Sequence, residues 1–78
     1  MSNYLTLIYL VARYNHLLTR FGMRLTKGNT SLVNQIVKEA LEEAYEENKL
    51  YDTPELRILL KNKVVAKAKA SANNFHLH

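Results

Sequence analysis

The sequence predicts an all-α protein, a compact bundle of three helices at about residues 3–25, 31–50 and 54–72. In each of these segments apolar residues recur at steps of three and four, which places them on one face of a helix. No stretch alternates apolar and polar residues for long enough to indicate a half-buried strand. Turn-forming residues separate the segments, in KGNTS and in YDTP. The pattern therefore favours helices joined by short loops.

The first segment carries an apolar stripe and, on its opposite side, a polar stripe that is rich in arginine. The apolar stripe consists of Leu7, Leu10, Val11, Tyr14, Leu18, Phe21 and Leu25. The opposite side holds Tyr9, Arg13, His16, Arg20 and Arg24. Gly22 is tolerable inside a helix but costs up to about 1 kcal/mol relative to alanine, which leaves open a bend or an early end there.

The second segment is predicted to begin after KGNTS, with the hydroxyl of Thr30 or Ser31 as the N-cap, and to end near Leu50. Its apolar stripe consists of Val33, Ile36, Val37, Ala40 and Ala44. The carboxylates that gather on a different face are Glu39, Glu42, Glu43 and Glu46.

The third segment has the clearest start signal. Asp52 or Thr53 can cap it, Pro54 suits the first helical position, and Glu55 suits the first turn because the helix dipole favours negative charge there. Its inner stripe consists of Leu56, Leu60, Val64 and Ala68, with Leu59 and Val65 beside it. We expect a single helical domain over residues 1–74 and a flexible tail over 75–78.

Size and composition restrict the class of protein. A chain of 78 residues with 47% apolar and 23% charged residues forms one small globular domain, with room for a core but not for a deep enzyme cleft. Its sequence contains no cysteine, so packing rather than disulfides must stabilise it. The apolar run YLTLIYLVA is far shorter than the roughly 20 residues of a membrane-spanning helix. We therefore expect a cytoplasmic protein with no membrane role.

Catalytic and metal-binding patterns are weak. The three histidines are His16, His76 and His78, and the last two lie in the predicted tail, where a spacing of two residues either binds a metal weakly or merely reflects the end of the chain. The glycines number two, too few for a phosphate-binding loop. No serine has an evident histidine and carboxylate partner. We expect no enzyme activity, no cofactor and no metal site.

Charge is divided into three blocks along the chain. Residues 1–30 hold four bases and no acid, residues 31–53 hold two bases and six acids, and residues 54–78 hold five bases and one acid, which gives +4, −4 and +4. Two interpretations remain open. The acidic helix can be compensated by its basic neighbours, through surface pairs of about 0 to 1 kcal/mol each. Alternatively, the acidic surface meets a basic protein and a basic surface meets phosphates.

Two adjoining stretches carry a family resemblance: YNHLLTRFGMRLTKGNTSLVNQIVKEALEEAYEEN and LYDTPELRILLKNKVVAKAKA. They resemble region 2 of the bacterial extracytoplasmic-function sigma factors, the RNA polymerase specificity subunits. The matching positions are Arg24, Leu25 and Thr26 in an RLT element, Ile36, Val37 and Glu39 in the acidic helix, and the aromatic Tyr45 near its end. The likeness covers about residues 10–70.

The resemblance implies a helical domain whose acidic helix docks on the RNA polymerase core and whose third helix faces promoter DNA. The implied polymerase-binding residues are Glu39, Glu42, Glu43 and Glu46. The candidates for nucleic-acid binding are Lys61, Lys63, Lys67 and Lys69, together with the basic stripe of Arg13, Arg20 and Arg24. That stripe equally suits pairing with the glutamates, and the lysines equally suit a solvated helix.

Two departures from the family separate this chain from a complete sigma factor. Residues 54–74 contain no aromatic side chain on which an unstacked base could sit, and residues 1–78 hold no segment that resembles the family's second DNA-binding domain. We therefore expect a reduced, divergent sigma-like domain. The alternative is a helical protein-interaction module with no nucleic-acid role. Tyr4, Leu5, Ile8 and Tyr9 make the first helix more apolar than a three-helix domain can cover, which predicts a homodimer through this helix.

Overall fold

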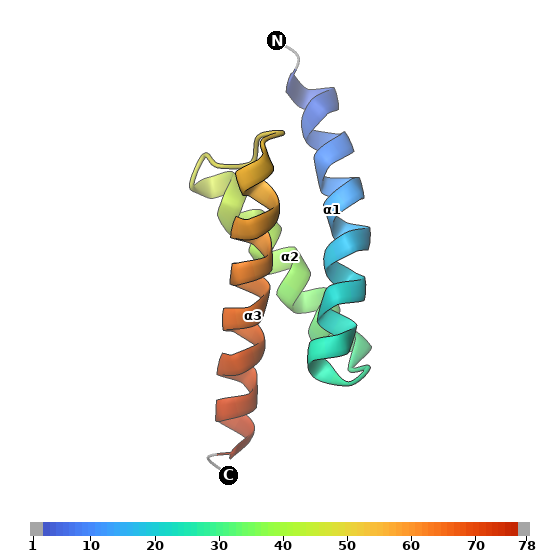
Figure 1. Cartoon of the computed structure of the whole chain (residues 1–78), viewed down its shortest axis with the longest axis vertical. Coiled ribbons are helices and arrows are strands. Elements are labelled where there is room, and N and C mark those ends of the chain that lie inside the picture. Colours follow the sequence, from blue (N-terminus) through green and yellow to red (C-terminus); the bar gives the residue numbers. More distant parts are fainter. Residues whose placement is uncertain (1–2, 77–78) are drawn as a thin grey trace.

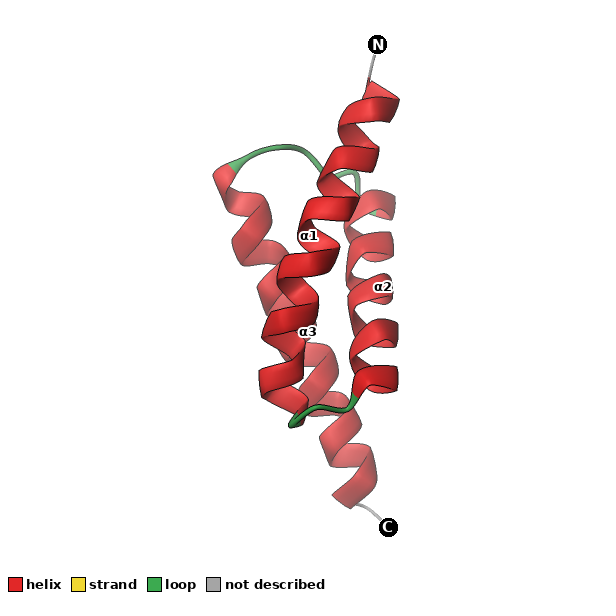
Figure 2. Ribbon diagram, turned by 90° about the vertical axis from the view of Figure 1, so that its right-hand side faces the viewer, coloured by secondary structure: helices red, strands yellow, loops and turns green. Residues whose placement is uncertain are grey.

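A computed structural model of the chain describes the backbone of residues 3–76 and the side chains of residues 4–71. It confirms the predicted all-α bundle, with helices α1 (Asn3–Thr26), α2 (Thr30–Glu46) and α3 (Pro54–His76) and no strand in the described backbone. The chain runs down α1, up α2 and down α3, so α1 and α3 are parallel (Figure 1). The bundle measures 48 × 21 × 18 Å, and each helix packs against both others. The first turns of α1 rise beyond the α2–α3 loop in both Figure 1 and Figure 2.

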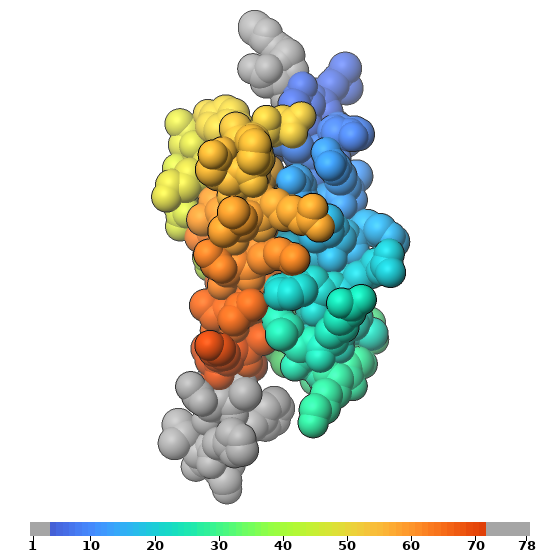
Figure 3. All heavy atoms as spheres, in the orientation of Figure 1, coloured from blue at the N-terminus to red at the C-terminus, as the bar shows by residue number. Residues whose placement is uncertain are grey.

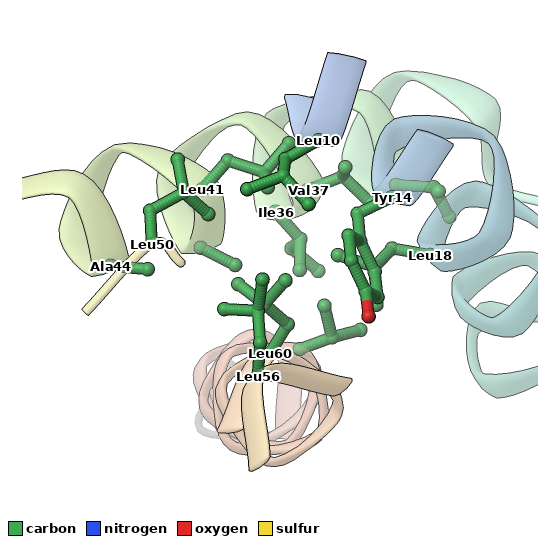
Figure 4. Close-up of a cluster of buried hydrophobic side chains, with 13 residues drawn as sticks. Leu10, Tyr14, Leu18, Ile36, Val37, Leu41, Ala44, Leu50, Leu56 and Leu60 are labelled. Carbon is green, nitrogen blue, oxygen red and sulfur yellow. The ribbon is translucent and has the colours of Figure 1, made fainter. Parts of the chain in front are cut away.

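The core lies along the axis of the bundle and is built from all three predicted apolar stripes. Figure 4 shows leucines and Tyr14 from the three helices converging there. The buried residues are Leu10, Tyr14, Leu18, Val33, Ile36, Val37, Ala40, Leu41, Ala44, Leu50, Leu56, Leu60 and Val64. The stripe predicted for α1 is wrong at Val11 and Leu25, which are 37% and 42% exposed. Val11 lies at the edge of the buried face, and Leu25 lies in the last turn of α1. Leu41 and Leu50 are buried although the predicted stripes did not include them.

Each loop has a residue in the left-handed backbone region close to its start. Lys27 follows α1 with φ 57°, and Asn48 follows the end of α2 with φ 60°. The Gly28 amide donates to the Met23 carbonyl, and the Lys49 amide donates to the Ala44 carbonyl, each at 2.9 Å. These are the bonds of a Schellman motif, which ends a helix by satisfying its last carbonyls. The prediction that the second helix continues to about Leu50 is therefore wrong, because Asn48 ends it.

The start of α2 also differs from the prediction. The N-cap is Asn29 rather than Thr30 or Ser31, and its Oδ1 accepts a hydrogen bond from the Leu32 amide at 3.2 Å. At α3, Pro54 takes the first helical position as predicted, and the Leu56 amide donates to the Thr53 carbonyl at 3.1 Å. The helix continues to His76, further than the predicted end near Ala72. Of the predicted tail, Leu77 and His78 lie outside the described residues.

Gly22 does not end α1, which is continuous to Thr26. The glycine is buried against α2. A Cβ atom at this position would lie 3.0 Å from Cγ1 of Val33, which is closer than ordinary van der Waals contact. The missing side chain therefore allows α1 to approach α2 at this level.

Candidate functional site

Basic side chains from α1 and α3 share one side of the bundle, which we call the cationic face. Its residues are Arg13, His16, Arg20 and Arg24 from α1 and Arg57 and Lys61 from α3. The first four recur at steps of three and four along α1, and Arg57 and Lys61 are one turn apart on α3, so each set lies on one side of its helix. Figure 3 shows the side of the molecule on which the atoms of α1 and α3 meet along a continuous seam.

Two shallow grooves between α1 and α3 are lined by these residues. The first, of about 330 Å³, is lined by His16, Leu17, Arg20, Phe21, Arg24, Arg57 and Lys61. The second, of about 450 Å³, is lined by Arg13, Tyr14, Leu17, Asp52, Thr53, Pro54 and Arg57. The two grooves share Leu17 and Arg57, so they adjoin. Asp52 is the single carboxylate among the residues that line them.

Among the described residues, the guanidinium and ammonium groups of the cationic face have no carboxylate partner. Every ion pair in the described part of the chain uses Lys63 or Lys67. Within residues 4–71, no acidic side chain therefore lies within 4.0 Å of an arginine of this face, Asp52 included. The described acids therefore do not compensate the charge of this surface through ion pairs.

Two basic groups of the cationic face lie over aromatic rings. Nζ of Lys61 is 4.8 Å from the centroid of the Phe21 ring, and the Arg13 guanidinium carbon is 5.7 Å from that of Tyr14. A cation held over a ring is attracted to its negative face. The Lys61 contact joins α3 to α1 between two residues that line the first groove, so it helps to fix the position of this charge.

The other side of α3 faces the glutamates of α2. Nζ of Lys63 lies 3.3 Å from Glu43 Oε1 and 3.0 Å from Glu47 Oε2. Nζ of Lys67 pairs with Glu43 Oε2 and lies 3.8 Å from Glu39 Oε1. We call these five residues the α2–α3 ion cluster. The lysine side chains are mostly buried, at 14% and 20% exposure, while the carboxylates are more open to solvent.

The ion cluster shifts the protonation of its central groups. The hydrogen bond from Lys67 lowers the pKa of Glu43. Burial raises this pKa, but the hydrogen bond from Lys63 lowers it further, so that the pKa lies below its ordinary value. Burial opposes the charged form of Lys63, but its hydrogen bonds to Glu47 and Glu43 outweigh this and raise its pKa. Both groups are therefore held in their charged forms.

The structure divides the predicted polymerase-binding glutamates into two pairs. Glu39 and Glu43 belong to the α2–α3 ion cluster, and Glu39 also accepts a hydrogen bond from Gln35 Nε2 at 3.2 Å. Glu42 and Glu46 are exposed and take part in no ion pair of the described residues. The free acidic surface of α2 is thus smaller than the sequence predicts.

The predicted nucleic-acid-binding residues are divided as well. Arg13, Arg20, Arg24 and Lys61 meet on the cationic face. Lys63 and Lys67 turn towards α2, while Lys69 is exposed elsewhere on α3. Sequence reasoning missed Arg57, although its spacing of one turn from Lys61 was a usable signal.

Within residues 3–76, no helix is both long enough and apolar enough to cross a membrane. Among the described side chains, histidines and acids form no group of three that could hold a metal ion. No family model, curated protein or solved structure shows significant similarity to this chain. Its geometry is therefore the basis for a functional proposal.

Proposed function

We propose that this chain is a non-catalytic nucleic-acid-binding module that places the cationic face against a sugar–phosphate backbone. The observation that supports this function is the gathering of basic side chains from two helices with no carboxylate partner among the described residues. Basic side chains that compensate acids within the fold would be paired, as Lys63 and Lys67 are. Unpaired charge of one sign attracts a polyanion and supplies sequence-independent affinity.

The extent of the face favours a polymer over a small anion. From Arg13 to Arg24, at 1.5 Å per helical residue, the α1 part of the cationic face is ~16 Å long. Phosphates of one duplex strand follow each other at ~3.4 Å along the helix axis, so this length faces several of them. Lys61 lies over the Phe21 ring and leaves less of it for base stacking. Affinity should therefore come from phosphates, with little sequence preference.

The test is the salt dependence of binding to a short DNA duplex of arbitrary sequence, measured by fluorescence anisotropy. Each phosphate contact contributes about −0.9 to the slope of log K against log salt concentration. With five permanently charged groups on the face, we expect a slope of about −4.5. The double variant Arg20→Gln/Arg57→Gln should reduce that slope by about two.

Lys69→Gln is the matched control, since Lys69 is an exposed base on α3 that does not line either groove. This variant should leave the slope close to that of the unchanged chain. A loss of about one in the slope from Lys69→Gln, the same per removed charge as from the double variant, would mean that binding is diffuse rather than centred on the cationic face. No measurable salt-dependent binding would overturn the proposal and leave a protein-interaction module without a nucleic-acid role.

A second candidate is the sigma-like role, in which α2 docks on the RNA polymerase core and the nucleic acid is promoter DNA in the cytoplasm. The observation that favours it is the pair of exposed carboxylates, Glu42 and Glu46, beside the exposed ring of Tyr45. Glu39 and Glu43 contribute less in this proposal, because Lys63 and Lys67 already neutralise them.

Retention on immobilised bacterial core RNA polymerase tests this candidate. We expect Glu42→Lys/Glu46→Lys to abolish retention, because it replaces free negative charge with positive charge. Glu55→Lys is the control, since Glu55 is an exposed acid in the first turn of α3 and not on α2. Retention that survives the α2 variant, or that is absent from the unchanged chain, would remove the polymerase role.

A further inference from the structure

The described residues that line the two grooves of the cationic face include two aromatic rings, which differ in burial. Tyr14 lines one groove and Phe21 lines the other. Tyr14 is 5% exposed and belongs to the core, where Figure 4 shows it among side chains of the three helices. Phe21 packs against the same core but is only partly buried. The Phe21 ring is therefore the aromatic surface that a ligand in these grooves meets.

Lys61 covers this ring. Its Nζ reaches from α3 to a point 4.8 Å from the centroid of the Phe21 ring on α1. Lys61 is itself partly buried, and it belongs to none of the ion pairs of the described residues. No carboxylate of these residues therefore draws the ammonium group away from the ring. The ring lies between core side chains and a positive charge.

Duplex and single-stranded nucleic acids use such a surface differently. A duplex keeps its bases stacked inside and presents one phosphate charge per ~1.7 Å of its axis. A single strand presents fewer charges and gains affinity from unpaired bases that stack on aromatic rings, by about 5- to 150-fold per base. A ring beneath an ammonium group withholds this gain from a single strand, while the charge remains available to phosphates.

We propose that Lys61 determines the form of nucleic acid that the cationic face selects, because it keeps bases off the Phe21 ring and so favours a duplex over a single strand. This inference rests on the proposed function. The charge of Lys61 serves both forms, whereas its position over the ring acts against the single strand alone. Tyr9 is exposed one turn before Arg13 but lines neither groove, so stacking on Tyr9 does not depend on Lys61.

Fluorescence anisotropy with a short labelled strand of mixed sequence, used alone and annealed to its complement, tests the selection. A phosphate contact contributes about −0.9 to the salt slope for a duplex and about −0.7 for a single strand. Five contacts then give slopes of about −4.5 and −3.5, and an affinity about tenfold higher for the duplex at ~0.1 M salt. Tighter binding of the single strand by the unchanged chain would overturn the selection.

Lys61→Ala separates the two effects of the lysine, because it removes both a charge and the cover of the ring. We expect the ratio of duplex to single-strand affinity to fall at least about fivefold, since one base gains a stacking surface. Arg24→Ala is the matched control, as Arg24 is exposed, lines the same groove and lies over no ring of the described residues. It should weaken both complexes and change their ratio less than about twofold at ~0.1 M salt.

The double variant Lys61→Ala/Phe21→Leu tests the ring itself, because leucine keeps an apolar side chain against the core and offers no surface for stacking. Its affinity ratio should return to that of Arg24→Ala. Equal ratios in Lys61→Ala and Arg24→Ala would overturn the role of Lys61, and so would a single-strand gain that persists in the double variant. The proposed function stands in each of these cases, since salt-dependent binding remains. Absence of binding to both forms would overturn the proposed function, and this inference with it.

Discussion

Gly22 and Val33 show how a single residue sets the distance between two helices. Gly22 is buried, and its backbone conformation is that of an ordinary helix, so the glycine is not required by a turn. The glycine is instead required by the close approach of α1 to α2, because an added Cβ atom would lie 3.0 Å from Cγ1 of Val33. Val33 is fully buried and β-branched, and therefore has little freedom to move away.

We predict that Gly22→Ala lowers the free energy of unfolding by about 1 kcal/mol. Overpacking costs ~1–3 kcal/mol, which outweighs a helix-propensity gain of up to ~1 kcal/mol. In a Val33→Ala background the same change should be stabilising, because the two Cγ atoms are gone. Urea denaturation of the four chains measures both effects. A gain in stability from Gly22→Ala alone would show that α1 and α2 are not in close contact here.

At the scale of the elements, α2 is held by α3 through both apolar and ionic contacts. The apolar contact consists of leucine, isoleucine, valine and alanine side chains in the core, and the α2–α3 ion cluster lies along its edge. Surface pairs of this kind contribute about 0 to 1 kcal/mol each, so they favour the alignment of the two helices without creating the fold. The cluster thus confirms that the glutamates of α2 are compensated in part by lysines of α3.

The ion cluster gives stability a dependence on pH. The pKa of Glu43 lies below its ordinary value of 4.5, so its stabilising effect is present above pH 4.5 and is lost as pH falls through the lower folded value. The pKa of Lys63 lies above 10.5, so its effect is present below pH 10.5 and is lost as pH rises through the higher folded value.

We predict that Glu43→Gln lowers stability at neutral pH by at most about 1 kcal/mol, since the carboxylate is partly exposed and screened. The variant should also lose less stability than the unchanged chain as pH falls below 4.5, because it lacks the group that titrates. Thermal unfolding followed by circular dichroism across this pH range measures both effects. Glu46→Gln is the control, as Glu46 is exposed and in no ion pair of the described residues, and it should keep the acid dependence. If Glu43→Gln lost as much stability below pH 4.5 as the unchanged chain does, this would contradict the role of Glu43 as a group whose titration destabilises the bundle.

For the whole molecule, the sequence predicts the helices better than the surfaces. The periodicity of α1, α2 and α3 is local, so the stripes around Leu10, Val37 and Leu60 could be assigned from spacing alone. The end of α2 could not be assigned from spacing, because Asn48 adopts a left-handed backbone conformation that glycine more often takes. The arginine stripe of α1 was also predictable. That Arg57 lies beside this stripe could not be predicted, because it depends on how α3 is rotated against α1.

The antiparallel order of α1, α2 and α3 along the chain has a kinetic consequence. Loops of residues 27–29 and 47–53 bring each helix directly against the next, so contacts between successive helices form by closing short segments of chain. Helical bundles rich in such local contacts reach their native state within microseconds to milliseconds, whereas sheets that pair distant strands are slower. Newly made copies of this chain should therefore expose their leucines to one another only briefly before the bundle closes.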